Sequence, residues 1–303
     1  MNEKEKYPLH QLFICIFVLI SIFLITFRIL FNFFYFPELI KISKDYDYRL
    51  LLKGMDNGLI HFYDPIDNYD WPPYYLYFWF FLFFPMYLMP FEIGVYVWDI
   101  LRLVMGIYIV HEAPKIFKSE LDLFIFYALS SISYALDAYY NNCNFLITFL
   151  LFLSYESLEK DRKWLSGLFF TLATFKINSL LFLPILLIIK KIELKDIKFY
   201  IIPFCVACIP YIIFPEYFMQ MVANWGHSDD YVEGITGFDS IFWKALQPTH
   251  LMTISLFLLI FIENINSKKR KHQFNAFFLP ILIIYYVYLT MIVFFLPFLG
   301  PNS

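Results

Sequence analysis

The 303-residue sequence has few charged residues and little glycine: Asp, Glu, Lys and Arg make up 16% of it, and only 9 residues are glycine. Its net charge is -3, and no basic block in it suggests a nucleic-acid partner. It also has no Gly-rich linker, low-complexity tract or internal repeat. The sequence therefore predicts a single domain over residues 1–303.

Cysteine is also scarce, with only Cys15, Cys143, Cys205 and Cys208 in the chain. Three of them lie inside hydrophobic segments, where cysteine acts as a small apolar residue. The pair Cys205 and Cys208 has no histidine or second cysteine pair near it, so the spacing does not indicate a zinc site.

Apolar residues, in contrast, dominate the chain. The hydrophobic share is 60% and the mean hydropathy is +0.62, whereas soluble domains have about 45–50% apolar residues. The sequence thus predicts an all-α polytopic membrane protein. The first apolar run is too long for a signal-peptide core and lacks a small-residue cleavage site, so we interpret it as a span. The apolar segments are residues 11–36, 74–89, 93–110, 121–136, 145–153, 164–175, 180–189, 199–214, 251–262 and 274–298.

Basic residues predict the orientation, because Lys and Arg in short loops stay on the cytoplasmic side. The basic clusters are Lys115/Lys118, Lys160/Arg162/Lys163, Lys190/Lys191/Lys195/Lys198 and residues 268–271. They share the side of the N-terminus only if residues 74–110 make one net crossing. We therefore expect residues 74–89 to dip in from the outer side and return, or to lie along the outer surface. This gives about nine crossings, a cytoplasmic N-terminus, and long extracytoplasmic loops at residues 37–73 and 215–250.

The first of these loops contains a polar, acidic and aromatic segment, residues 45–73, directly after a span. It opens with Asp45 and Asp47. Its middle part predicts an amphipathic helix on the membrane surface, with its apolar side formed by Leu50, Leu51, Met55 and Leu59. It closes with Tyr-Asp-Trp-Pro-Pro, where prolines fix the backbone and Trp71 can lie at headgroup level.

The order of the polar motifs resembles glycosyltransferase family 87. The motifs are an aspartate after the first span, Tyr-Asp-Trp-Pro-Pro, Pro90 and then Trp98, Asn-Asn-Cys-Asn ending at Asn144, residues 159–167, and Phe-Lys-Ile-Asn at 175–178. The likeness covers about residues 45–184. The chain departs from the family pattern in having Trp71 before the prolines, Asn141-Asn142 for Gly-Gln, and Ile177 and Ser179 for two prolines.

This resemblance implies a GT-C-like helical bundle in the cell membrane with its active site on the extracytoplasmic side. The implied reaction transfers a hexose, with mannose first, from a polyprenyl-phosphate sugar to a lipid-linked or glycan hydroxyl, with inversion. The implied partners are that donor, that acceptor and membrane lipids. The resemblance implies no metal ion, and we expect no cofactor.

Two carboxylates are candidates for the general base of this reaction. The resemblance favours Asp47, with Asp45 second. A base must lie within hydrogen-bond reach of the acceptor hydroxyl. The alternative is that either aspartate caps the surface helix, where its charge meets the positive helix end.

Further residues are candidates for binding the donor phosphate or the sugar. Lys176 is placed to meet a lipid phosphate, although a lysine there also snorkels to the interface. Asn142 and Asn144 open a helix and are expected to cap it, to bind a sugar, or to do both. His227 is a candidate for acid-base chemistry or for orienting the phosphate, or is simply solvated. Trp71 belongs to the same predicted set.

The charged residues inside the spans have competing interpretations. Arg102 is a candidate for substrate binding, but its spacing from Asp99 favours an internal salt bridge. For Arg28 we favour snorkelling over a phosphate contact. Two other functions stay open for the chain: a transporter or flippase of lipid-linked sugars, and an inactive relative of the family.

Overall fold

The computed structural model describes residues 7–34, 45–64, 73, 75–117, 119–227, 253 and 255–260. Within these ranges the secondary structure is helical, without strands. The chain divides into two compact units, Met1–Leu259 and Ile260–Ser303, and the elements described here belong to the first. The prediction of one domain stays a prediction. The elements are α1 (Tyr7–Phe34), α2 (Tyr46–Lys53), α3 (Trp79–Tyr87), α4 (Phe91–Ile116), α5 (Glu120–Tyr140), α6 (Asn144–Glu159), α7 (Lys163–Ala173), η2 (Ile177–Leu181), α8 (Phe182–Ile188), η3 (Leu194–Asp196), α9 (Lys198–Ala207), α10 (Ile209–Ile213) and α11 (Pro215–His227).

Three of the described helices are long and apolar enough to cross a bilayer: Leu9–Leu30, Phe91–Ile116 and Glu120–Tyr140, with mean hydropathies of 2.8, 1.8 and 1.3. A helix needs roughly 20 apolar residues to span the hydrocarbon core. This confirms the helical membrane class. It does not confirm the predicted count of about nine crossings, because the other described helices are shorter and residues 261–303 lie outside the description.

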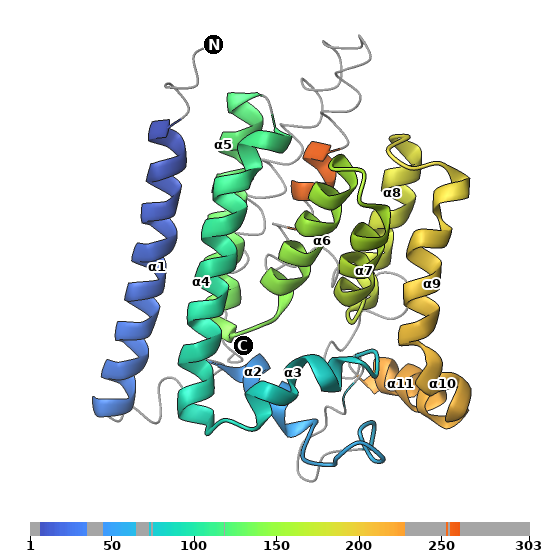
Figure 1. Ribbon diagram of the computed structural model, residues 1–303. Coiled ribbons are helices and arrows are strands. Elements are labelled where there is room, and N and C mark those ends of the chain that lie inside the picture. The colour runs from blue at the N-terminus through green and yellow to red at the C-terminus, as the bar shows by residue number, and fades with distance from the viewer. Residues whose placement is uncertain are drawn as a thin grey trace, which may run out of the picture. The chain divides into compact units, whose positions relative to one another are not determined.

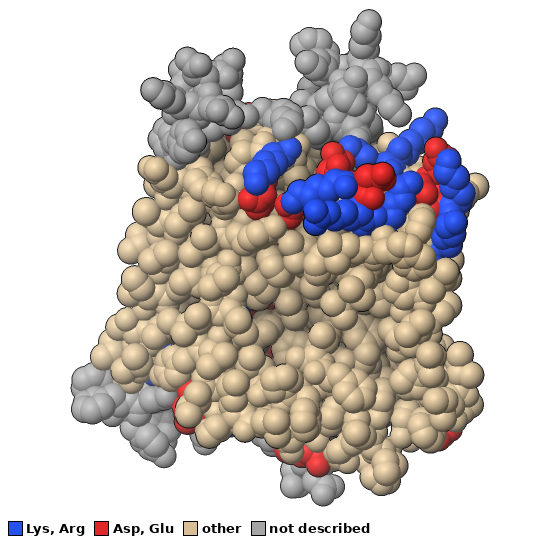
Figure 2. All heavy atoms as spheres, in the orientation of Figure 1, with Lys and Arg blue, Asp and Glu red and all other residues tan. Residues whose placement is uncertain are grey.

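The helices α1 and α4–α9 run roughly alongside one another, so their turns collect at two ends (Figure 1). The turns from α4 to α5, α6 to α7 and α8 to α9 lie at one end, where a band of basic and acidic side chains covers the surface (Figure 2). We call this the basic end. Its ion pairs include Lys115–Glu112 at 2.5 Å, Lys163–Asp196 at 2.9 Å and Lys191–Glu159 at 2.6 Å. Which side of a membrane this end faces stays a prediction.

The opposite end, which we call the site end, carries α2, α3, α10 and α11 (Figure 1). Helix α3 has 9 residues with Pro85 inside it, too few to cross a bilayer. The predicted re-entrant path of residues 74–89 is not confirmed, and α3 lies at the same end as α2 (Figure 1).

The surface helix of the first loop is shorter than predicted. Helix α2 ends at Lys53, and turns follow it to Asp64. Met55 is 1% exposed whereas Leu59 is 42% exposed, so Leu59 does not continue the apolar face. Residues 215–227 of the second predicted loop form helix α11.

Small residues and hydroxyl groups allow the long helices to approach closely. Phe17 of α1 stacks on Tyr134 of α5 at 4.6 Å between ring centroids, and it also covers Gly106 of α4. On the other side of the bundle, Gly167 of α7 meets the backbone of α9, where a Cβ atom would lie 1.8 Å from the Phe199 carbonyl oxygen. These contacts hold the helices that carry the polar site.

Candidate active site

Charged side chains from different helices meet inside the protein near the site end, and we call this group the buried ion network. Each member is at most 7% exposed. Ionised groups are costly to bury unless they are paired and hydrogen-bonded. The members are Arg28 of α1, Asp45 before α2, Asp99 and Arg102 of α4, and Asp137 of α5.

Arg28 joins α1 to the start of the first loop. Its Nε donates to Asp45 Oδ2 at 2.9 Å and its Nη2 donates to Asp45 Oδ1 at 2.7 Å. Its Nη1 donates to Asp99 Oδ2. The paired bonds to Asp45 have the bidentate geometry that suits a guanidinium and a carboxylate. The snorkelling interpretation of Arg28 was therefore wrong: the side chain is 2% exposed because two buried carboxylates hold it.

Arg102 joins α4 to the end of α5. Its Nη1 donates to Asp99 Oδ1 at 2.9 Å, which confirms the predicted pair, and its Nε donates to Asp137 Oδ2 at 3.1 Å. Its Nη2 donates to Asn141 Oδ1 at 2.6 Å. Arg102 is 0% exposed, and its bonds to Asp137 and Asn141 hold the turn after α5 in place.

The turn from α5 to α6 carries three asparagines in four residues. Asn141 adopts the left-handed conformation, with φ 55°, which asparagine tolerates better than most residues. Asp137, in the last helical turn of α5, holds this connection in place. Its carbonyl accepts from Asn142 N at 2.9 Å and its Oδ1 accepts from Asn144 N at 3.1 Å. Asn141 Nδ2 also donates to Asp45 Oδ1 at 2.7 Å.

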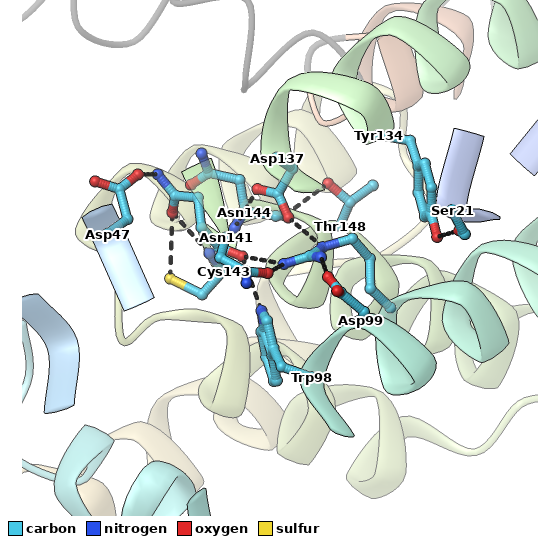
Figure 3. A network of polar contacts seen from close by, with 12 residues as sticks. Ser21, Asp47, Trp98, Asp99, Tyr134, Asp137, Asn141, Cys143, Asn144 and Thr148 are labelled. Carbon is cyan, nitrogen blue, oxygen red and sulfur yellow. Dashed lines mark hydrogen bonds and ion pairs between the residues drawn. The ribbon is translucent and has the colours of Figure 1, made fainter. Parts of the chain in front are cut away.

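A second group, which we call the base–ammonium cluster, consists of Asp47, Asn142, Asn144 and Lys176. Asn142 is central to it: its Nδ2 donates to Asp47 Oδ2, and its Oδ1 accepts from Lys176 Nζ at 2.9 Å. Lys176 Nζ also donates to Asn144 Oδ1 at 2.8 Å and lies 5.5 Å from the centre of the Tyr75 ring. Figure 3 shows Asp47 beside the asparagine turn, at the edge of the polar network that includes Asp99 and Asp137.

The two candidate bases have different surroundings. Burial raises the pKa of the Asp47 carboxyl above its ordinary value, while the Lys176 ammonium and the Asn142 amide act in the opposite direction. Asp47 is half-buried, and the bond that it accepts from Asn142 is on Oδ2. Asp45, in contrast, accepts bonds from Arg28 or Asn141 on both carboxylate oxygens. Asp45 is thus a member of the buried ion network, while the role of Asp47 as general base stays a prediction.

Residues 74–295 of the chain match a family model, glycosyltransferase family 87. The match covers more than half of the 303 residues. The chain belongs to glycosyltransferase family 87. It is a membrane glycosyltransferase, an enzyme that acts on a donor and an acceptor. The same comparisons find no matching curated protein and no matching solved structure.

The family 87 match includes Arg102, Asn142, Asn144 and Lys176 and extends well beyond residue 184, where the sequence resemblance fades. The matched range begins at residue 74, so it does not include Asp47. The case for Asp47 as the base therefore rests on its hydrogen bond with Asn142, which lies inside the matched range. Trp71 lies outside the described residues.

The predicted role of His227 stays a prediction in this family 87 chain, and that of the asparagines changes in part. His227 is the last residue of α11, and its side chain lies outside the description. The predicted capping role of the asparagines is partly wrong, because Cys143 is the N-cap of α6, without a side-chain cap bond, and the Asn144 side chain instead accepts from Lys176.

Sequence reasoning missed Asp137 and Asn141 and misjudged Arg28. One signal was available: an ionisable residue inside a span is functional or paired by default. Asp137 lies in the apolar helix α5, three residues before the end of that helix. A search for a residue that pairs with this aspartate would have led to Arg102.

Proposed function

We propose that this family 87 enzyme transfers a hexose, with mannose as the first candidate, from a polyprenyl-phosphate sugar to a hydroxyl of a lipid-linked or glycan acceptor. The observation that carries the proposal is the base–ammonium cluster. A half-buried carboxylate and an ammonium group are held on either side of one amide, Asn142. Sugar transfer from a lipid phosphate needs these groups, because one group takes a proton while the other meets a departing phosphate.

In the proposed reaction Asp47 is the general base. Its carboxylate accepts the proton of the acceptor hydroxyl as that oxygen forms a bond to the anomeric carbon. The bond from the anomeric carbon to the phosphate oxygen breaks, and the phosphate takes the bonding electron pair. Attack from the face opposite the leaving group inverts the anomeric configuration.

Lys176 stabilises the negative charge that develops on the leaving phosphate. Its ammonium is a compact charge with three donors, and the backbone of Lys176 is extended directly before η2. Asn142 donates to Asp47 and accepts from Lys176, so one amide links the carboxylate to the ammonium. We place the reaction at the outer face of the membrane, which the positive-inside rule supports because the basic end lies opposite the site end.

The first test replaces Asp47 by Asn in the full chain. Membranes that contain the variant are supplied with a polyprenyl-phosphate sugar and an acceptor lipid fraction, and the transferred sugar is counted. We expect a loss of about 100-fold or more, the size typical of general-base catalysis, with normal insertion into the membrane. Asp56→Asn is the matched control, because Asp56 is an exposed carboxylate in the same segment.

Full activity of Asp47→Asn, with Asp45 also replaced, would end the proposed mechanism. The donor is tested in the same assay by comparing polyprenyl-phosphate mannose, polyprenyl-phosphate glucose and a nucleotide sugar. Transfer from the nucleotide sugar alone would contradict the proposed donor class.

The transport alternative needs ionisable groups near the middle of the bilayer. The buried ion network lies nearer to one end: Arg28 precedes the end of α1 by 6 residues, or about 9 Å, and Asp99 follows the start of α4 by 8 residues, or about 12 Å. A charge network at this depth is better explained as the support of a site at the membrane surface.

A further inference from the structure

One buried hydrogen-bond donor next to Lys176 has no acceptor among the described residues. It is the side-chain nitrogen Nδ2 of Asn144, a residue that is 1% exposed. Its orientation is determined by its neighbour: Lys176 Nζ lies 2.8 Å from Asn144 Oδ1, and an ammonium can only donate. Rotating the amide would bring two donors together, so Nδ2 is the atom left over. Buried donors without an acceptor are rare in proteins and call for an explanation.

The surroundings of this nitrogen favour a negatively charged acceptor. Asn144 is the first residue of α6, a helix of 16 residues, and the N-cap Cys143 makes no side-chain cap bond. The first turn of α6 contains no acidic residue of its own, and the carboxylate that meets the positive end of its dipole is Asp137, whose Oδ1 accepts from Asn144 N at 3.1 Å. The Lys176 ammonium adds a full positive charge beside the same amide.

We propose that Asn144 Nδ2 donates a hydrogen bond to one phosphate oxygen of the polyprenyl-phosphate group, together with Lys176 and the start of α6. This inference rests on the proposed function and deepens it, because it assigns Asn144 to the phosphate. The sequence had placed Asn144 in a general set of donor-phosphate and substrate ligands, with a sugar contact as its specific role. A phosphate oxygen accepts without donating and carries the negative charge that the Lys176 ammonium beside the same amide favours.

The contacts around Asn144 also hold its side-chain donor in position. Asp137 Oδ1 accepts from Asn144 N at 3.1 Å, and Thr148 Oγ1 donates to the Asn144 carbonyl at 3.2 Å. The backbone of Asn144 is therefore fixed on both sides. Its side chain is held by Lys176, so binding a phosphate requires little reorganisation of this residue.

The test measures binding rather than transfer, so that it does not depend on the base. The full chain, purified in detergent, is titrated with a short-chain polyprenyl phosphate, with the corresponding polyprenol and with polyprenyl-phosphate mannose. The variants are Asn144→Ala and Asn144→Asp. The second keeps an oxygen for Lys176 and replaces the donor nitrogen by an anionic oxygen, which preserves the shape of the side chain if the alanine variant fails to fold. Asn57→Ala is the control, since Asn57 lies in the loop after α2 and donates to the Asp64 carbonyl.

We expect Asn144→Ala to weaken binding of polyprenyl phosphate by roughly ten-fold to a hundred-fold, the effect of losing one hydrogen bond to a charged group. Asn144→Asp weakens it further, because the added carboxylate repels the phosphate. The affinity for polyprenol stays unchanged in both variants, and Asn57→Ala binds all ligands like the unmodified protein. Inorganic phosphate at millimolar concentration competes with polyprenyl phosphate if the site recognises the phosphate itself, and lack of competition would assign the recognition to the whole lipid headgroup. Either result is compatible with the bond from Asn144.

Two outcomes overturn the inference. Unchanged affinity for polyprenyl phosphate in both variants shows that the nitrogen does not contact the phosphate. Weaker binding of the mannose-bearing donor alone assigns Asn144 to the sugar. If the unmodified protein binds no polyprenyl phosphate at all, the proposed donor class fails as well, so the two failures are distinguishable.

Discussion

Replacing Asp45 by Ala tests whether the two aspartates of the first loop have separate roles. The change removes both hydrogen bonds from Arg28 and the bond from Asn141, and it leaves Arg28 with Asp99 as its remaining carboxylate partner among the described residues. The two side chains are only 3% and 10% exposed, so water does not replace the lost partner. Removing one member of a buried ion pair costs about 3–5 kcal/mol.

For a protein of this size the loss corresponds to a fall of roughly 10 °C in the unfolding temperature. Asp47→Asn, in contrast, keeps an oxygen that accepts from the Asn142 amide, and the side chain is half-buried. We expect it to change the unfolding free energy by less than about 1 kcal/mol. Its effect is on transfer.

The assay measures thermal unfolding of each detergent-solubilised variant together with sugar transfer well below its unfolding temperature. The single variants Arg28→Met and Asp45→Ala and the double variant Arg28→Met/Asp45→Ala together form a double-mutant cycle. We expect the double variant to lose at least about 1 kcal/mol less than the sum of the two single variants, because the pair is removed without leaving a lone charge. An unfolding temperature unchanged in Asp45→Ala, or additivity in the cycle, would refute the reasoning.

The remaining predictions concern pH, packing and topology. Because burial raises the pKa of Asp47, kcat/KM rises with pH through a midpoint above the ordinary carboxyl value of about 4; a midpoint at or below that value in a pH profile would contradict the assignment. Gly167→Ala separates α7 from α9, because the new Cβ meets the Phe199 carbonyl oxygen at 1.8 Å; thermal unfolding shows strong destabilisation, while any folded fraction keeps its KM for the donor. In a background without the native cysteines, Lys160→Cys and Asp56→Cys react with a membrane-impermeant thiol reagent from opposite sides of the cell membrane, with Asp56→Cys labelled from outside; labelling of both from one side would contradict the predicted topology.

Much of the site was accessible from the sequence because its residues lie at the ends of apolar segments, where polar groups stand out. Asp47, Asn142, Asn144 and Lys176 were each identified this way, and the structure brings them into one hydrogen-bonded cluster. The pair of Asp99 and Arg102 followed from helical spacing. None of these patterns predicted which of these residues contact one another, because residues 47, 142 and 176 are distant in the chain.

Composition and hydropathy alone determined that this is a helical membrane protein, because long apolar segments are stable in lipid only when their backbone groups are paired within a helix. The motif order determined the family. Only the tertiary structure decided the surroundings of the two aspartates. Arg28 lies on α1 and Asn141 follows α5, and their approach to Asp45 depends on how those helices pack. Because of that packing, both carboxylate oxygens of Asp45 accept hydrogen bonds from buried side chains. Asp47, two residues later, instead lies beside the Asn142 amide, which also binds the Lys176 ammonium.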